Sequence, residues 1–291
     1  FTPNGKNIWT PERYHAKLLA LSAVIRTAAD GKAPAIIGLC EIENEEVVRD
    51  LGKVISGGDF EYGVITFPSP DMRGIDNAIL YRKELFKVSG TTFHRLHFPD
   101  EEEYTSRDIL HVWGKFKKMK EPVHFFVNHW PSRRGGSEAS EPRRVVAAEK
   151  LKDAVAAVQN EYEDPLIVIM GDFNDEPQDN SLRETLRASL VLSTPENHKL
   201  YNLMGPADLK DEGTYNYRGN WNMLDQFIVT GNLLSPKSKW IATDCAARQE
   251  VWMMHYNSER DDHSPSRTYG GPNYYGGFSD HLPIVLSLVR R

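Results

Sequence analysis

Short apolar rows that begin or end in a carboxylate constrain the fold of this chain more than any other feature of its sequence. Alternate residues of a β-strand share one face, so the apolar row within 166–170 continues on the same face to Asp172. Corresponding rows end at Glu41 and begin at Asp225 and Asp280. If the last two strands run antiparallel to the first two, all four carboxylates reach the same edge of the core.

Histidines accompany these carboxylates. His129 ends the apolar row within 123–127 in the same way, and His281 directly follows Asp280. Partly desolvated carboxylates repel one another, and a divalent cation or a histidine relieves that repulsion. Oxygen ligands favour Mg²⁺, with Mn²⁺ or Ca²⁺ as alternatives, over zinc. At a single position a carboxylate often just marks a strand end, but the recurrence of the pattern favours a shared site.

The remaining patterns indicate helices and strands in alternation. Thr10 followed by Pro11 is a helix-start signal, and residues at helical spacing continue it to about residue 29. Further helices are predicted at 44–55, 141–160 and 179–187, and buried strands at 35–42, 165–170, 224–230 and 281–289. Residues 61–130 have the pattern of an antiparallel meander, and the polar stretch 243–279 that of a long surface loop. Together these patterns are typical of one α/β domain with two sheets and helices outside.

Composition narrows the class of protein. Lys and Arg total 35 and Asp and Glu 41, a formal charge of -6, so a protein that grips polyanions by overall charge is not expected. The two cysteines, Cys40 and Cys245, exclude a disulfide scaffold and a four-cysteine zinc site. The longest uninterrupted apolar runs, such as 166–170, have five residues, far below the roughly 18 residues of a membrane span, so no transmembrane segment is expected. Because the chain begins with Phe1 rather than Met, we expect a trimmed targeting peptide and a secreted or periplasmic protein.

Five motifs, in this order, resemble those of the endonuclease/exonuclease/phosphatase superfamily of deoxyribonuclease I-like enzymes. They are Gly-Leu-Cys-Glu at 38–41, Asn-His-Trp-Pro-Ser at 128–132, Gly-Asp-Phe-Asn at 171–174, Leu-Asp-Gln-Phe at 224–227 and Ser-Asp-His at 279–281. The resemblance extends over essentially the whole chain, and the chain looks most like a bacterial member. It implies a four-layered α/β sandwich, with two mainly antiparallel sheets face to face, helices outside and the site at one end.

One departure from the family pattern concerns the N-terminus. The family begins with a strand that carries a metal-binding Asn, whereas residues 1–5 already approach the first predicted helix. Asn4 and Asn7 do not match that strand. We therefore expect residues 1–291 to form one domain that lacks its first strand.

The resemblance also implies roles in the hydrolysis of a phosphate ester by an activated water. Glu41 resembles the metal ligand of the family, and Asp280 a second carboxylate on the metal side. Asp172 would orient and deprotonate the attacking water. Asn174 would hold water or a phosphate oxygen with its amide.

Histidine and carboxylate partners complete the implied machinery. His281 would donate to a non-bridging phosphate oxygen, and Asp225 resembles the carboxylate that keeps this histidine protonated by raising its pKa. His129 matches the histidine of the nuclease-like branch, which contacts the phosphate or acts as general acid. Asp76 is the candidate partner of His129.

Arginines near these motifs are candidates for substrate binding. Arg107 resembles a phosphate-contacting arginine of the nuclease-like branch, although a solvated surface arginine fits the same pattern. Arg133 and Arg134 follow His129, and with the arginines at 143–144 they predict a local positive rim. The alternative is a flexible, solvated loop.

Three functions stay open from the sequence. A Mg²⁺-dependent nuclease or phosphodiesterase acting on nucleic acid is favoured by His129 and Arg107. A phosphatase or phospholipase C-like enzyme acting on a small phosphorylated or lipid substrate is favoured by the low basicity, although 171–174 and 223–227 depart from the inositol 5-phosphatase strings. The third function is a catalytically inactive binding domain of the same fold. We expect a monomer in each case.

Overall fold

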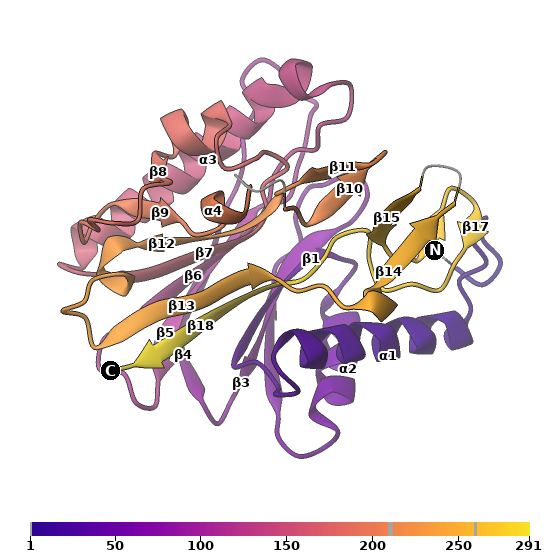
Figure 1. Ribbon diagram of the computed structural model, residues 1–291, viewed down its shortest axis with the longest axis horizontal. Helices are drawn as coiled ribbons and strands as arrows, with labels where there is room; N and C mark the ends of the chain where they lie inside the picture. Colours follow the sequence, from indigo (N-terminus) through magenta and orange to yellow (C-terminus); the bar gives the residue numbers. More distant parts are fainter. Residues whose placement is uncertain (1, 209–211, 259–260) are drawn as a thin grey trace.

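A seven-stranded sheet forms the centre of the fold (Figure 1). The structure is a computed structural model that describes residues 2–208, 212–258 and 261–291. The strand order is β4-β5-β6-β7-β12-β9-β8, antiparallel except for the β6–β7 and β8–β9 pairs. The strands are β4 (Phe86–His94), β5 (Ile109–Phe116), β6 (Val123–His129), β7 (Leu166–Asp172), β8 (Ala188–Ser189), β9 (Leu200–Asn202) and β12 (Asp225–Thr230).

Both faces of this central sheet are buried, which explains the continuous apolar runs in its middle strands. In β7, Val168 and Met170 lie in the apolar cluster on one face, whereas Ile167 and Ile169 lie in the cluster on the other. A strand that is covered on both sides needs apolar residues at every position, so the usual alternation of polar and apolar residues is absent.

A second sheet layer packs against one face of the central sheet. It consists of a three-stranded sheet in the order β1-β3-β2 and of the antiparallel pair β13-β18. The strands are β1 (Ile36–Ile42), β2 (Tyr62–Thr66), β3 (Asp76–Arg82), β13 (Trp240–Ala247) and β18 (Ile284–Arg290). Ile79 of β3 and Ile284 of β18 pack with Val127 and Val168 of the central sheet, so one apolar core fills the space between the two layers.

Helices cover the two outer faces (Figure 1). Leu151 of α3 packs with Phe126 on the outer face of the central sheet, and Leu18 of α1 packs with Leu80 on the outer face of the β1-β3-β2 sheet, next to α2. The helices are α1 (Pro11–Ala28), α2 (Glu45–Ser56), α3 (Ser137–Glu161), α4 (Gly205–Asp208), the π-helical turn η1 (Ser181–Thr185) and the 3₁₀ turns η2 (Gly231–Leu233) and η3 (Val251–Met253). The predicted four-layered α/β sandwich is confirmed. None of the helices among the described residues combines the length and hydropathy that crossing a bilayer requires.

Local capping explains where the first two helices begin and end. The Thr10 side chain accepts a hydrogen bond from the backbone N–H of Arg13, and Asn44 caps α2 in the same way. Gly57, with a φ of 61°, ends α2 in the left-handed conformation. The predicted helices 11–29 and 44–55 are therefore confirmed to within one residue. The third helix begins at Ser137 rather than 141.

Two predicted strand arrangements are corrected by the structure. Residues 61–130 form strands as predicted, β2 to β6, but these strands do not make one meander. β2 and β3 belong to the second sheet layer, and β4 to β6 to the central sheet. The last strand starts at Ile284 rather than at 281, because His281 forms only an isolated bridge with Tyr215. Asp280 and His281 thus lie in a turn that leads into β18.

The prediction of a long loop at 243–279 is wrong. That stretch contains the end of β13 and two small antiparallel pairs, β14-β15 and β16-β17, and β15 contacts β10 of a third small pair, β10-β11. The strands are β10 (Tyr215–Tyr217), β11 (Asn220–Asn222), β14 (Met254–Asn257), β15 (Asp262–Pro265), β16 (Tyr269–Gly270) and β17 (Asn273–Tyr274). These strands are short and polar, so no apolar alternation marks them in the sequence.

The edge strands of the second sheet layer are relevant to the family strand that was expected before the first helix. Among the described residues, β1 has β3 as its only hydrogen-bonded neighbour strand, and β18 has only β13. The expectation of one domain that lacks its first strand stays a prediction.

Candidate active site

Three neighbouring strands of the central sheet carry His129, Asp172 and Asp225 to one end of the sandwich. In the parallel β6–β7 ladder, His129 is the Cα partner of Asp172. In the antiparallel β7–β12 ladder, Asp225 is the partner of the same residue. Because alternate residues share a face, all three side chains continue the rows that point toward the second sheet layer.

Asp172, Asp225 and His281 form a compact charged cluster. One atom of each lies within 4.8 Å of the others, and His281 Nδ1 lies 2.7 Å from Asp225 Oδ2. Burial alone would lower the pKa of His281, but Asp225, followed by Asp172 and Asp280, outweighs it and raises that pKa to about 10. Burial raises the pKa of Asp172 to about 7, which His281 offsets only in part. A protonated imidazolium therefore lies beside a carboxyl group that titrates near neutrality.

A tight turn after β7 orients Asp172. Asn174 has a φ of 51°, and its backbone N–H donates to Asp172 Oδ1 at 2.9 Å. Its side-chain amide donates to Asp172 Oδ2 and to the Trp130 carbonyl, both at 3.1 Å. Gly171, with a φ of 132°, brings its backbone so close to β6 that a Cβ would lie 1.9 Å from the Asn128 carbonyl oxygen. One residue thus holds both carboxylate oxygens, and a contact of its amide with substrate or water stays a prediction.

His129 is buried beside this turn. Its Nε2 lies 3.5 Å from Asp172 Oδ2, and 6% of the residue is exposed. Burial lowers the pKa of His129 well below its usual value, and the charges of Arg107 and Arg73 lower it further. A neutral imidazole donates a hydrogen bond but is a poor general acid at neutral pH. The contact of His129 with the phosphate, the other predicted role, stays a prediction.

Asp76 does not partner His129. Asp76 Oδ1 instead accepts a hydrogen bond from the backbone N–H of Ser69 at 2.6 Å, which ties down the β2–β3 connection. Within the described ranges of the chain, His129 Nδ1 has no hydrogen-bond partner. The predicted pairing is therefore wrong, because Asp76 is turned toward its own connecting segment.

Arg107 is buried and forms hydrogen bonds within the protein. Only 3% of it is exposed, and its guanidinium donates to Asp71 Oδ2 at 3.1 Å and to the Trp130 carbonyl at 2.5 Å. Asp71 also accepts from Arg73, whose Nη1 lies 3.4 Å from Glu41 Oε1. A solvated surface arginine is excluded. Direct contact of Arg107 with a phosphate is not what this arrangement provides, because its charge is already paired beneath the site.

Glu41 and Asp280 lie at the same end of the sandwich as the cluster, and we call this end the mouth of the site. Glu41 lies within a bulge of β1, has a φ of 59° and is exposed, and Asp280 is exposed as well. Both carboxylates raise the pKa of the Lys17 ammonium, although burial dominates and lowers it to about 8. In the part of the chain that the structure describes, only Asp172, Asp225 and His281 meet the distance for joint ligation of an ion. The predicted pair of metal ligands is thus near the cluster but not joined to it.

The predicted positive rim is largely neutralised. Three of its four arginines pair with carboxylates: Arg133 with Asp179, Arg143 with Glu101 and Arg144 with Asp175. Arg134 is exposed and makes no hydrogen bond or ion pair with the described residues. A substrate would therefore meet one unpaired guanidinium of this set, and Arg133 is not free to bind it.

Sequence reasoning missed the buried pair of Arg144 and Asp175 and the tether at Lys17. Lys17 donates to Thr268 Oγ1 at 2.7 Å and to the Phe278 carbonyl, which holds the turn before His281. Arg144 lies four residues before Ala148 on the apolar face of α3, and a charged residue on such a face signals a buried partner. The tether had no comparable local signal.

Comparison with known proteins identifies the family pattern over the whole chain. A sequence model of the Endonuclease/Exonuclease/phosphatase family matches residues 1–290. No curated protein matches the chain.

Solved structures share the fold at low identity. The mannosyl-6-phosphatase of Bacteroides thetaiotaomicron is 16% identical, with a TM-score of 0.61 and coverage of 95% of this chain and 91% of that one. The human nocturnin catalytic domain with bound sulfate is 18% identical, with a TM-score of 0.60 and coverage of 95% and 86%. Truncated TDP2 of Caenorhabditis elegans is 17% identical, with a TM-score of 0.56 and coverage of 94% and 91%. At these identities the likeness establishes the fold.

Proposed function

The chain belongs to the endonuclease/exonuclease/phosphatase family, and on this premise we propose that it is a divalent-metal-dependent phosphodiesterase of the nuclease type. Proteins of this family are phosphoric ester hydrolases, so hydrolysis of a phosphate ester is the activity that membership itself supports. Two further points are our proposal: the substrate is a phosphodiester, namely a nucleic acid, and the metal is Mg²⁺.

The cluster of Asp172, Asp225 and His281 carries this proposal. Asp172, with a pKa raised to about 7, takes a proton from a water molecule held beside it. His281, with a pKa raised to about 10, donates to a non-bridging phosphate oxygen as negative charge develops there. Asp225 keeps His281 charged and oriented through its 2.7 Å contact.

The carboxylates at the mouth fit a hard divalent cation. Such a cation polarises the phosphoryl oxygen and steadies the charge of the leaving group. Glu41 and Asp280 would hold it, because both are exposed oxygen donors next to a cluster whose acids outnumber its histidine. Binding of a cation by Glu41 would compete only with its 3.4 Å contact with Arg73. Mn²⁺ or Ca²⁺ suits the same donor set.

A phosphatase acting on a small phosphorylated substrate is the second candidate. The specific observation in its favour is the pairing of Arg133, Arg143 and Arg144 with carboxylates, which leaves one unpaired arginine in the predicted rim for contact with a polyanion. The formal charge of -6 points the same way. One structural neighbour is a mannosyl-6-phosphatase.

A substrate panel with Mg²⁺ separates these functions. The chain is assayed against plasmid DNA, RNA, a bis-ester reporter and a monoester reporter. Turnover of the nucleic acids and the bis-ester supports the first proposal, and turnover of the monoester alone supports the phosphatase. No turnover of any of the four, with Mg²⁺, Mn²⁺ or Ca²⁺, would contradict both and favour a binding domain.

A further inference from the structure

We propose that Arg133 is a positioning residue that fixes the Asn174 turn in one half of the active site to the segment that leads into the other half. One half is Asp172 with its Asn174 clamp, and the other is Asp225 with His281. The inference rests on the proposed function for its catalytic meaning, and it replaces the substrate-binding role predicted for Arg133 from the sequence.

Arg133 connects segments that are far apart in the sequence. Its Nε donates to the Asn174 carbonyl at 2.8 Å, and its Nη1 donates to Asn222 Oδ1 at 2.9 Å. Its Nη2 donates to Asp179 Oδ2 at 2.8 Å. All three guanidinium nitrogens are therefore used within the protein, and the side chain is 23% exposed. The planar, rigid fork of arginine suits a bridge of this kind.

The bridged segments are those that carry the reacting groups. The Asn174 carbonyl belongs to the residue that holds both oxygens of Asp172. Asn222 ends β11, three residues before Asp225 at the start of β12. The β7–β12 ladder fixes the backbones of Asp172 and Asp225. Arg133 adds a side-chain link between the Asn174 turn, which orients the Asp172 carboxylate, and the segment before Asp225.

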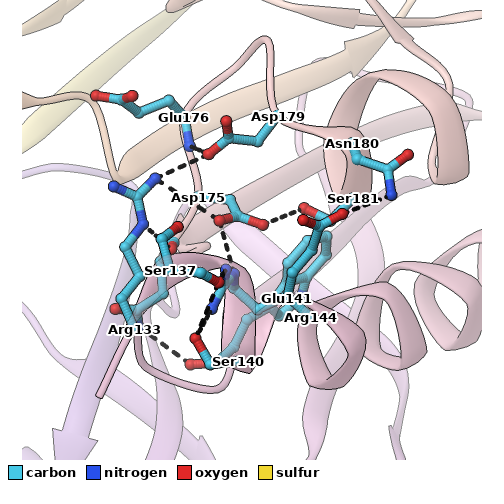
Figure 2. Close-up of polar contacts among 12 residues, drawn as sticks. Arg133, Ser137, Ser140, Glu141, Arg144, Asp175, Glu176, Asp179, Asn180 and Ser181 are labelled. Carbon is cyan, nitrogen blue, oxygen red and sulfur yellow. Dashed lines mark hydrogen bonds and ion pairs between the residues drawn. The ribbon is translucent and has the colours of Figure 1, made fainter. Parts of the chain in front are cut away.

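A buried ion pair anchors the bridge from below (Figure 2). Arg144 Nε lies 2.6 Å from Asp175 Oδ1, each side chain is 1% exposed, and Asp175 Oδ2 accepts from Ser181 Oγ at 2.6 Å. Arg133 Nη2 lies 3.6 Å from the same Asp175 oxygen. Arg144 Nη2 also donates to the Ser137 carbonyl at 2.8 Å, so the start of α3, just after Arg133, is fixed to the same carboxylate. The pair thus limits where Arg133 is able to lie.

Kinetics of Arg133→Gln test the role, with Arg290→Gln as the matched control. Misplacement of reacting groups lowers kcat, so we expect Arg133→Gln to lose about tenfold to a hundredfold in kcat with KM nearly unchanged. Arg290→Gln, at an exposed position where β18 ends away from the site, should keep kcat. Arg133→Lys retains the charge toward Asp179 but does not span three acceptors. We therefore expect this variant to have the melting temperature of the wild type but the lowered kcat of Arg133→Gln. A raised KM with an unchanged kcat for Arg133→Gln would instead establish a substrate contact and overturn the proposal.

Hydrogen exchange supplies a readout that does not need activity. The backbone amide proton of Asn174 is held by Asp172 Oδ1, and we expect its exchange to be faster in Arg133→Gln and unchanged in Arg290→Gln. Lower kcat with unchanged exchange would contradict positioning through Asn174. If the wild-type chain hydrolyses no reporter, the proposed function fails, while the exchange result still decides the structural claim. Should Arg133→Gln not fold, Asn222→Ala removes one acceptor only and should change both readouts in the same direction; no change in either would overturn the proposal.

Discussion

Asp225 lies directly opposite Asp172 in the β7–β12 ladder, so a single strand pairing brings two carboxylates together at one end of the sandwich. The charge of Asp225 adds to the rise that burial causes in the pKa of Asp172, and it is the main force that raises the pKa of His281. The register of one pair of strands thus determines the protonation states on which the proposed chemistry depends.

Removing either proposed acid–base group should abolish turnover. Asp172→Asn eliminates the group that takes the proton from water, and His281→Gln eliminates the charged donor. Each should lower kcat by about 10²- to 10⁴-fold at an unchanged circular-dichroism spectrum. Asp100→Asn, at an exposed position with no part in the site, serves as control. Wild-type activity in either site variant would contradict the mechanism.

The pH profile should move when Asp225 is neutralised. With a pKa of about 7 for Asp172 and about 10 for His281, kcat/KM should rise as Asp172 deprotonates and fall as His281 deprotonates. Asp225→Asn removes the largest contribution that opposes burial, so the pKa of His281 falls and the alkaline limb moves to lower pH. The profile is measured with the bis-ester reporter at saturating Mg²⁺. An alkaline limb that stays in place would rule out His281 as its source.

Glu41 should control the affinity for the divalent cation. Glu41→Gln keeps the size of the side chain but loses the charge, so the Mg²⁺ concentration for half-maximal activity should rise by about tenfold or more. Calorimetric titration with Mn²⁺ should show the same loss. Glu43→Gln, an exposed neighbour outside the mouth, is the control. Equal cation affinity in Glu41→Gln and the wild type would place the metal elsewhere.

A methyl group at position 171 should disrupt the turn that carries Asp172. Gly171→Ala combines a left-handed φ of 132° with a Cβ 1.9 Å from the Asn128 carbonyl oxygen. We expect a loss of about 3 kcal/mol or more in the free energy of unfolding. Gly135→Ala, with a φ of 93° and no atom within 4 Å of the added Cβ, has only the backbone cost of about 1 kcal/mol. Urea unfolding measures both, and equal losses would show that the contact with β6 relaxes freely.

Buried histidines far from the site should make stability depend on pH. His111 Nε2 lies 3.0 Å from His124 Nδ1 under α3, and burial lowers the two pKa values to about 3 and about 4. The unfolded chain takes up these protons near pH ~6.5, so the stabilisation from the neutral rings is complete above that pH and is lost as the pH falls toward 4. Replacing both rings, His111→Phe with His124→Phe, should flatten the fall in the unfolding midpoint between pH 6.5 and 4. His15→Gln, at an exposed position on α1, should leave the fall as in the wild type, and an equal fall in the double variant would exclude the two rings as its cause.

The convergence of acids at one mouth was predictable because it depends on local patterns. A strand repeats every two residues, so Asp172 and Asp225 could be assigned to the same faces as their apolar rows from the sequence alone. The apolar patterns predicted two sheets with helices outside, and the order of the four layers was implied by the family resemblance of the motifs. Asp280 and His281 were placed in a strand wrongly, because the alternation that begins at 284 extends by chance into the preceding turn.

Partners of charged side chains were decided by the tertiary structure. Arg107 and Arg133 have the sequence signature of solvated arginines, yet Arg107 is buried on Asp71, and Arg133 spans Asn174, Asn222 and Asp179. An arginine is long and flexible, and its charge is neutralised by whichever carboxylate the fold brings within reach, often from a distant segment.

The sequence by itself therefore determined the layers, the acids at the strand ends and the family pattern, since each follows from the repeat of a strand or helix or from a short motif. Only the tertiary structure decided which charges are free and which are paired, including the protonated His281 and the neutral His129. Burial and the distance between charges control these states, and both are properties of the packed chain and not of any segment alone.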